Sequence, residues 1–276
     1  KPNKKSLKNY LKDKLTKKEL SKLVKSYDLL GSIMILEIPK ELNKKEKLIA
    51  QAVLKLNKNI KTVLKKAGAH TGEFRTQRLK YLAGKKTRET LYKENNVLIK
   101  FDVEKVYFSM RLSSERKRVS EQIKTPETVL VMFSGCAPYV LTIAKNSKAK
   151  QVFGIEKNRV AHQYGIKNLK LNNINNATLL LGDVNKAVFK LNKKFDRILM
   201  PLPKSAKNFL DLIPKISKKG TTIHFYIFGT ENDIKKEKLL IKRKLPNTRI
   251  LRTVRCGSYS PKVFRNCIDF KIKTLK

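Results

Sequence analysis

One stretch, residues 129–145, constrains the fold more than any other part of the chain. An apolar run from Val129 to Phe133 enters a turn of small residues around Gly135, and a helical pattern follows at once. A second apolar run, residues 151–155, ends in Glu156. A strand, a tight turn, a helix and a second strand that ends in an acid open a nucleotide-binding βαβ unit, in which the acid holds ribose hydroxyls.

Strands and helices alternate from Thr128 onward, which predicts an α/β fold with a doubly wound, mostly parallel sheet. The last two apolar runs flank Gly257 to Pro261 and predict a terminal antiparallel pair. The expected strands are 128–133, 151–155, 177–181, 195–200, 220–228, 247–256 and 262–274, and the expected helices are 138–146, 157–172, 184–191, 204–218 and 230–244.

Residues 1–107 predict a small basic α+β domain in front of this sheet. Residues 1–27 have leucines at rough helical spacing, and residues 28–40 read as a strand broken at Gly31. Residues 108–127 form a connector and a helix, for which Ser113 is the expected N-cap. The expected elements are a helix at 43–58, strands at 60–66, 75–82, 89–93 and 96–107, and a helix at 113–124.

The net charge of the 276-residue chain is +42, from 64 Lys and Arg against 22 Asp and Glu. Such a charge repels itself unless the partner is a polyanion, so it indicates a nucleic-acid partner. A surface merely rich in lysine, as in hyperthermophile proteins, is the alternative. A hydrophobic content of 41% argues against disorder. No apolar run is long enough for a membrane span, and three cysteines without ligand spacing predict no metal site and fit a reducing cytosol.

The second domain carries an ordered set of motifs: the turn at Gly135, Glu156, Gly182-Asp183 after the third strand, and Met200-Pro-Leu-Pro203 after the fourth. This order resembles the S-adenosylmethionine-dependent methyltransferases of the Rossmann-like class, which also end their seven-stranded sheet in an antiparallel hairpin. The resemblance implies S-adenosylmethionine as cofactor and S-adenosylhomocysteine as product.

An upstream segment narrows the resemblance. Residues 106–118, Val-Tyr-Phe-Ser-Met-Arg-Leu-Ser-Ser-Glu-Arg-Lys-Arg, are similar to a signature of the archaeal and eukaryotic tRNA (guanine-N(1))-methyltransferases that act at position 37. The resemblance implies methyl transfer to N(1) of guanosine 37 in the tRNA anticodon loop, by a cytoplasmic monomer. Further matching stretches are 27–39, 61–68, 72–75, 93–95, 200–206 and 258–261.

The resemblance assigns the chemistry to two residues. Guanine N(1) carries a proton, and Glu115 matches the general base that removes it during transfer. Arg75 matches the guanidinium that stabilises charge on the exocyclic oxygen. From residue type alone, each residue has another interpretation. Glu115 can be an acid that stabilises the N-terminus of a helix, and Arg75 can be an ordinary surface cation.

The other site residues are also implied by the resemblance. Those expected at the cofactor are Tyr107, Arg111, Phe133, Gly135, Glu156, Asp183, Pro201 and Pro203. Those expected at the tRNA are Arg75, Arg116, Pro201, Ser258 and Tyr259.

Three positions depart from the family pattern: Val131 replaces the usual Asp, Ala137 the second turn glycine, and Pro201 the usual Asn. The Met-Pro-Leu-Pro turn at residues 200–203 is similar to that of an archaeal subgroup that also methylates a tricyclic wyosine precursor. Methylation of such a precursor by this chain is therefore a further hypothesis. The family's separate N-terminal module is expected to be absent or reduced to residues 1–15.

Two other functions remain open. Related wybutosine-pathway enzymes transfer the aminocarboxypropyl group of S-adenosylmethionine, although the presence of both Arg75 and Glu115 favours methylation. A non-catalytic RNA-binding protein with a decayed cofactor site is the other alternative, and Val131 and Ala137 motivate it.

Overall fold

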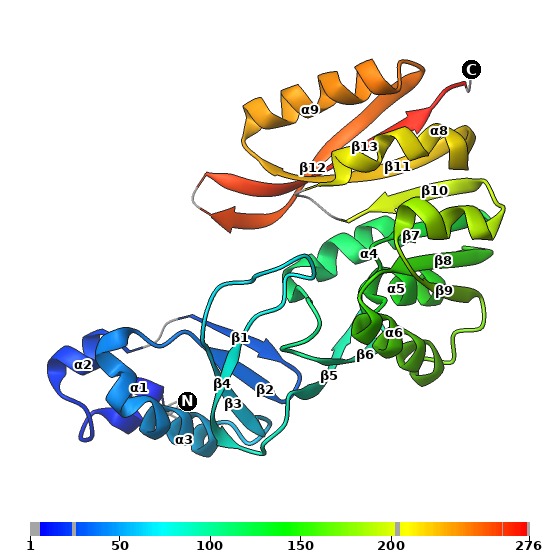
Figure 1. The fold of residues 1–276 in the computed structure, drawn as a ribbon. Helices are drawn as coiled ribbons and strands as arrows, with labels where there is room; N and C mark the ends of the chain where they lie inside the picture. The colour runs from blue at the N-terminus through cyan, green and yellow to red at the C-terminus, as the bar shows by residue number, and fades with distance from the viewer. Residues whose placement is uncertain (1–5, 24–25, 202–204, 261, 275–276) are drawn as a thin grey trace. The chain divides into compact units, whose positions relative to one another are not determined.

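The computed structural model describes residues 6–23, 26–201, 205–260 and 262–274. The chain divides into two compact units (Figure 1). The first comprises Lys1–Lys93 and Lys100–Tyr107, and the second comprises Glu94–Ile99 and Phe108–Lys276. None of the helices within the described ranges is long and apolar enough to cross a membrane.

The first unit is built on a four-stranded sheet of order β1-β2-β3-β4. Strands β2 and β3 are parallel and the other two pairs are antiparallel. The helix α3 packs on this sheet because its apolar positions recur at helical spacing, and Ile49, Ala50 and Val53 are buried. The elements are α1 (Leu7–Leu11), α2 (Lys17–Ser21), β1 (Tyr27–Leu30), β2 (Ile33–Leu36), η1 (Lys40–Lys45), α3 (Glu46–Leu56), β3 (Thr62–Lys66) and β4 (Leu79–Gly84).

A two-stranded hairpin, β5 (Glu89–Glu94) and β6 (Val97–Asp102), follows β4. Asn95 and Asn96 at its tip have φ of 42° and 61°, left-handed values that asparagine tolerates better than most residues. The tip therefore makes a tight turn, and residues 94–99 belong to the second unit.

Three predictions for the first unit need correction. The helical segment expected over 1–27 is two short helices, α1 and α2, with Thr16 capping the second. The broken strand at 28–40 is an antiparallel hairpin, β1 and β2, because Gly31 turns the chain with φ of +57°. The strand expected from Arg75 begins only at Leu79, since Arg75 itself lies in a turn with φ of 52°.

The second unit confirms the predicted α/β architecture. Its seven-stranded sheet has the order β12-β13-β11-β10-β7-β8-β9, in which the strands from β11 to β9 are parallel. Strands β13 and β12 add an antiparallel hairpin at the end, as expected. The strands are β7 (Thr128–Met132), β8 (Gln151–Glu156), β9 (Ala177–Leu181), β10 (Phe195–Met200), β11 (Ser217–Gly229), β12 (Thr248–Ser260) and β13 (Val263–Ile272).

Helices and 3-10 turns connect these strands. Two helices begin at residues that favour a helix start. Pro138 is the first residue of α5, and the Asn158 side chain accepts hydrogen bonds from backbone N–H groups in the first turn of α6. The elements are η2 (Met110–Leu112), α4 (Ser113–Glu121), α5 (Pro138–Asn146), α6 (Arg159–Leu171), α7 (Val184–Ala187), η3 (Val188–Leu191), η4 (Ala206–Leu212), α8 (Ile213–Ile216) and α9 (Glu231–Lys244).

Three predictions for this unit were wrong in detail. Ser113 is the first residue of α4 rather than its N-cap, and Leu112 occupies the cap without a side-chain hydrogen bond. The helix expected at 204–218 is broken into η4 and α8, and β11 begins at Ser217. Gly257 to Ser260, where a turn was expected, instead continue strand β12.

Candidate active site

The turn after β7 leaves its backbone open to a ligand. Gly135 has a φ of +58°, and a Cβ added there would meet no atom within 4 Å. Phe133 and Ala137 also have left-handed values, with φ of 57° and 73°. Left-handed non-glycine residues are strained, and such strain is typical of ligand clamps. The buried hydroxyl of Ser134 has no hydrogen-bond partner within the described residues, so both open space and an unsatisfied polar atom fit a bound polar molecule.

Glu156, at the end of β8, holds this turn in place. Its Oε2 accepts from the Gly135 N–H at 2.7 Å, and its Oε1 accepts from the Asn158 N–H at 2.6 Å. A carboxylate offers about four lone-pair sites, so one group can fix the loop and also accept from ribose hydroxyls. The structure thus gives Glu156 the position expected of a nucleoside-binding acid.

The other expected cofactor residues lie along the same sheet edge. Asp183 follows β9 and caps α7, accepting from the Asn185 N–H at 2.9 Å. That backbone hydrogen bond, with the charge of Lys157, holds the pKa of Asp183 below its usual value. Pro201 follows β10 directly. Because β10, β7, β8 and β9 are neighbours in the sheet, their carboxyl ends present these residues on one edge, where such folds bind ligands.

Glu115 occupies a different part of the second unit. It lies in the first turn of α4, only 4% exposed. Arg118, three residues later, donates to both carboxylate oxygens, at 2.7 Å to Oε1 and 2.6 Å to Oε2. The Tyr226 hydroxyl, from β11, also donates to Oε1 at 2.7 Å. The carboxylate is thus buried, paired with a guanidinium and fixed in orientation.

Arg118 connects Glu115 to a row of charged side chains beneath α4. Its Nη1 donates to Asp269 Oδ2 at 2.7 Å, and His224 Nδ1 lies 2.6 Å from Asp269 Oδ1. Arg197 Nη1 lies 2.8 Å from His224 Nε2 and pairs through Nε with Glu127 at 2.7 Å. Burial opposes the charge of Asp269, but hydrogen bonds from His224 and Arg118 outweigh burial and hold its pKa far below the usual range.

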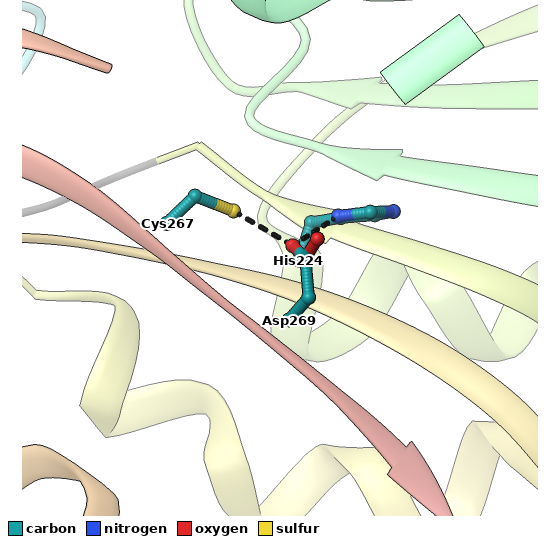
Figure 2. Close-up of side chains that lie close together, drawn as sticks. All are labelled: His224, Cys267 and Asp269. Atoms are coloured by element: carbon teal, nitrogen blue, oxygen red, sulfur yellow. Dashed lines mark hydrogen bonds and ion pairs between the residues drawn. The ribbon is translucent and has the colours of Figure 1, made fainter. Parts of the chain in front are cut away.

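His224, Cys267 and Asp269 also form a cluster of metal-ligand type (Figure 2). The hydrogen bonds argue against a metal there. A guanidinium can only donate, so Arg197 makes His224 Nε2 an acceptor and leaves the proton on Nδ1, facing Asp269. Burial lowers the pKa of His224, which agrees with this neutral ring. Both ring nitrogens are engaged, and Arg118 and Arg252 already supply the positive charge beside Asp269.

Arg75 lies in the first unit, where two side chains fix it. The Tyr107 ring lies 4.5 Å from the Arg75 guanidinium, a cation–π distance. His70 Nδ1 donates to the Arg75 carbonyl at 2.8 Å, and its ring meets Tyr107 edge-on at 5.5 Å. These contacts hold Arg75 in its left-handed conformation. Tyr107, expected at the cofactor, thus contacts Arg75.

The remaining expected residues fall into different environments. Arg116 is 1% exposed, and its guanidinium makes a bidentate pair with the buried Glu94. It therefore braces the hairpin tip within the second unit. Arg111 is exposed on η2, and Ser258 is exposed on β12. The ring of Phe133 packs edge-on against Phe209 at 4.8 Å. Pro203 and the side chain of Tyr259 lie outside what the structure describes.

Comparison with known protein families gives two matches along the chain. The TRM5/TYW2 methyltransferase domain matches residues 90–252, and the TYW2 N-terminal domain matches residues 7–87. The first match covers more than half of the chain. The chain belongs to the TRM5/TYW2 family. The tRNA (guanine(37)-N(1))-methyltransferase Trm5b of Pyrococcus abyssi is 37% identical over 90% of this chain and 74% of its own length.

Other TRM5/TYW2 relatives span both branches of the family. The tRNA(Phe) (4-demethylwyosine(37)-C(7)) aminocarboxypropyltransferase of Methanocaldococcus jannaschii is 32% identical over 91% of each chain. A solved complex of aTrm5 with tRNALeu has a TM-score of 0.86 and 32% identity, covering 98% of this chain and 79% of that one. Pyrococcus horikoshii TYW2 in complex with MeSAdo has a TM-score of 0.83 and 25% identity, covering 98% of each chain.

The expectations drawn from family motifs did not include the charged row beneath α4. Asp269, His224 and Tyr226 come from β13 and β11, which lie outside those motifs. One signal was available: Asp269 is a charged residue inside the apolar run Cys267-Ile-Asp-Phe270, and buried charges need partners. A second signal was the spacing of Glu115 and Arg118, three residues apart on an expected helix.

Proposed function

We propose that this TRM5/TYW2 protein transfers a methyl group from S-adenosylmethionine to N(1) of guanosine 37 in tRNA. The observation that carries the proposal is the presence, in one unit, of a Glu156-held loop and a buried, oriented carboxylate, Glu115. The Pyrococcus abyssi relative is named for this activity, which supports it. S-adenosylmethionine, when bound, supplies an electrophilic methyl group.

In this proposal, the turn around Gly135 and the neighbouring strand ends bind S-adenosylmethionine, the methyl donor. Glu156 would accept from the ribose hydroxyls, and the open space at Gly135 would let the donor approach the backbone. Asp183, which follows β9, would accept from the adenine amino group. Phe133 and Pro201 form apolar walls, and Pro203 belongs to the same turn by sequence. Because Ala137 is itself left-handed, the turn keeps its shape without the second glycine.

Glu115 acts as the general base. Guanine N(1) loses its proton as the methyl group arrives, and a carboxylate already oriented there avoids the cost of arranging a base during the reaction. Oε1 accepts from both Tyr226 and Arg118, whereas Arg118 Nε is the donor to Oε2. We assign the guanine proton to Oε2.

Arg75 stabilises the charge that develops on the guanine oxygen. Its contacts with Tyr107 and His70 restrict the conformations of the Arg75 side chain, so the guanidinium needs little rearrangement as the methyl group is transferred. On the strength of the family resemblance, we also place Ser258 and Tyr259 among the residues that contact tRNA, and Arg111 among those at the cofactor.

The partner is tRNA, and we propose that the enzyme binds its anticodon loop as a cytoplasmic monomer. A net charge of +42 supports contacts with many phosphates. The target base must leave its stack to reach Glu115, which costs a few kcal/mol in enzymes of this kind. Phosphate contacts offset that cost.

Mass spectrometry of position 37 tests the function directly. Incubation with S-adenosylmethionine and a guanosine-37 tRNA is expected to give 1-methylguanosine and S-adenosylhomocysteine. Glu115→Gln and Arg75→Ala are each expected to lower the rate by about 10²-fold or more. Glu121→Gln and Arg78→Ala, changes of the same type at exposed positions, serve as controls. Unmodified guanosine with the native protein would refute the proposal.

Aminocarboxypropyl transfer is the second candidate. The match to the TYW2 N-terminal domain and the aminocarboxypropyltransferase relative favour it. The by-product separates the two reactions, because aminocarboxypropyl transfer releases methylthioadenosine rather than S-adenosylhomocysteine. A parallel incubation with tRNA carrying 4-demethylwyosine tests whether a wyosine precursor is also methylated, as the Met-Pro-Leu-Pro turn suggests.

A further inference from the structure

The row of charges beneath α4 follows the order of the strands in the sheet. Asp269 lies on β13, His224 on β11 and Arg197 on β10, three neighbouring strands, and Glu127 directly precedes β7. Asp269 and His224 are register partners across β13 and β11. Asp269 and His224 are fully buried, and Arg197 is 6% exposed.

Alternation along the strands places this row on one face. On β11, Ile223, Phe225 and Ile227 belong to the apolar core of the sheet, so His224 and Tyr226 point to the opposite face. That face meets α4, since Tyr226 donates to Glu115. One strand therefore supplies two polar side chains to the same buried layer.

Burying so many charges is costly unless each is paired, and it needs a reason beyond stability. Replacing buried ion pairs by apolar residues of similar volume is often neutral or stabilising. In this row, every side chain is hydrogen-bonded to the next: Glu115, Arg118, Asp269, His224, Arg197 and Glu127. These hydrogen bonds hold each group in one orientation, with Glu115 at one end.

We propose that Tyr226 and Arg118 are positioning residues for Glu115, and that Asp269 and His224 hold Arg118 in turn. This inference rests on the proposed role of Glu115 as the general base. Tyr226 and Arg118 fix the orientation of the carboxylate, so no rearrangement of the base is needed when it takes the guanine proton.

The surroundings of Glu115 make Tyr226 the most informative residue. Burial foremost raises the pKa of Tyr226 and of Tyr139 well above 10.0, so both hydroxyls stay protonated. Tyr139 donates to the Tyr226 hydroxyl at 3.0 Å and so leaves the Tyr226 proton for Glu115. The other titratable and charged groups that face Glu115 are Arg118 on α4, Cys256 on β12 and Cys267 on β13.

Tyr226→Phe removes one hydroxyl and keeps the ring. The turnover number is expected to fall about ten- to hundred-fold, the range for a hydrogen bond to a charged group, with KM for tRNA and for S-adenosylmethionine within about two-fold. Because the change removes a donor that orients the base and leaves the binding residues in place, the loss falls on kcat rather than on KM. Arg118→Lys keeps the charge but loses the two-point contact, and is expected to lower kcat in the same way.

Tyr164→Phe is the matched control, a tyrosine 9% exposed on α6 of the same unit, for which no change in kcat is expected. If Glu115→Gln is fully active, the base assignment fails and this inference with it. If Glu115→Gln is inactive but Tyr226→Phe keeps the native kcat, only the positioning role is overturned. A Tyr226→Phe protein whose activity falls only in proportion to its loss of folded protein would also overturn it.

Discussion

Asp269→Asn is the change that most directly tests the charged row. Asp269 is fully buried and accepts from Arg118 Nη1 at 2.7 Å, from Arg252 Nε at 2.9 Å and from the His224 ring at 2.6 Å. Asparagine has nearly the same shape but carries no charge. Arg252 loses this counter-charge, Arg118 keeps only that of Glu115, and an amide N–H2 faces groups that can only donate.

The expected loss of stability follows from burial. Removing one partner of a buried ion pair costs about 3–5 kcal/mol. The low end of this range applies here, because the side chains of Arg118 and Arg252 are 20% and 49% exposed. For a unit of this size, about 3 kcal/mol corresponds to a drop of roughly 6–12 °C in melting temperature. Asp211→Asn is the matched control: Asp211 pairs with Lys244 at 2.7 Å, but its side chain is 71% exposed. Such a surface pair contributes about 0–1 kcal/mol.

The loss should also depend on pH. The pKa of Asp269 lies far below its usual value, so its stabilisation is complete above about pH 4, the ordinary value for Asp, and is lost as the pH falls further. The native protein should therefore lose more stability between pH 5 and pH 3 than Asp269→Asn does. Urea unfolding followed by hydrogen exchange in β11 and β13 reports on this unit alone. A destabilisation of Asp269→Asn within about 1 kcal/mol of Asp211→Asn at pH 7 would refute the reasoning.

Three further predictions concern the cofactor, the tRNA and acid stability. Glu156→Gln is expected to weaken S-adenosylmethionine binding about ten-fold or more by calorimetry, because it removes a charge-assisted acceptor from the loop, whereas Glu121→Gln leaves affinity unchanged. The affinity for tRNA should fall steeply with salt, and a flat response would contradict phosphate binding by the +42 chain. Burial holds the pKa of His224 below 6.5, so the unfolded chain takes up a proton first and stability falls as the pH drops below that value; His224→Gln should flatten this loss in thermal melts.

Elements set by local chemistry could be predicted from the sequence alone. The helix expected at 138–146 is found as Pro138–Asn146, because proline favours the first turn of a helix and an apolar face continues from it. The strand expected at 195–200 is found as Phe195–Met200. The four-residue disagreement at Arg75 has an equally local cause, a left-handed backbone that residue type does not predict.

The partners of Glu115 could not be predicted in the same way, because they depend on strand order. Arg118 is close in sequence, but Tyr226 and Asp269 are 111 and 151 residues away from their partners in the row. Asp269 reaches Arg118 because β13 lies beside β11, the strand that carries Tyr226. Alternation along a strand predicts which residues share a face, but it does not predict which strand lies next to it.

The terminal hairpin therefore has a role beyond covering the edge of the sheet. Its strand β13 runs antiparallel to β11, and that pairing sets Asp269 directly opposite His224. Asp269 then supplies the counter-charge for Arg118, and Arg118 holds Glu115. The carboxyl ends of the parallel strands carry the residues proposed for the donor, whereas the antiparallel addition carries Asp269, which holds one of the two residues that orient the proposed base. A change in the hairpin register by one residue would turn Asp269 to the other face and leave Arg118 without that counter-charge.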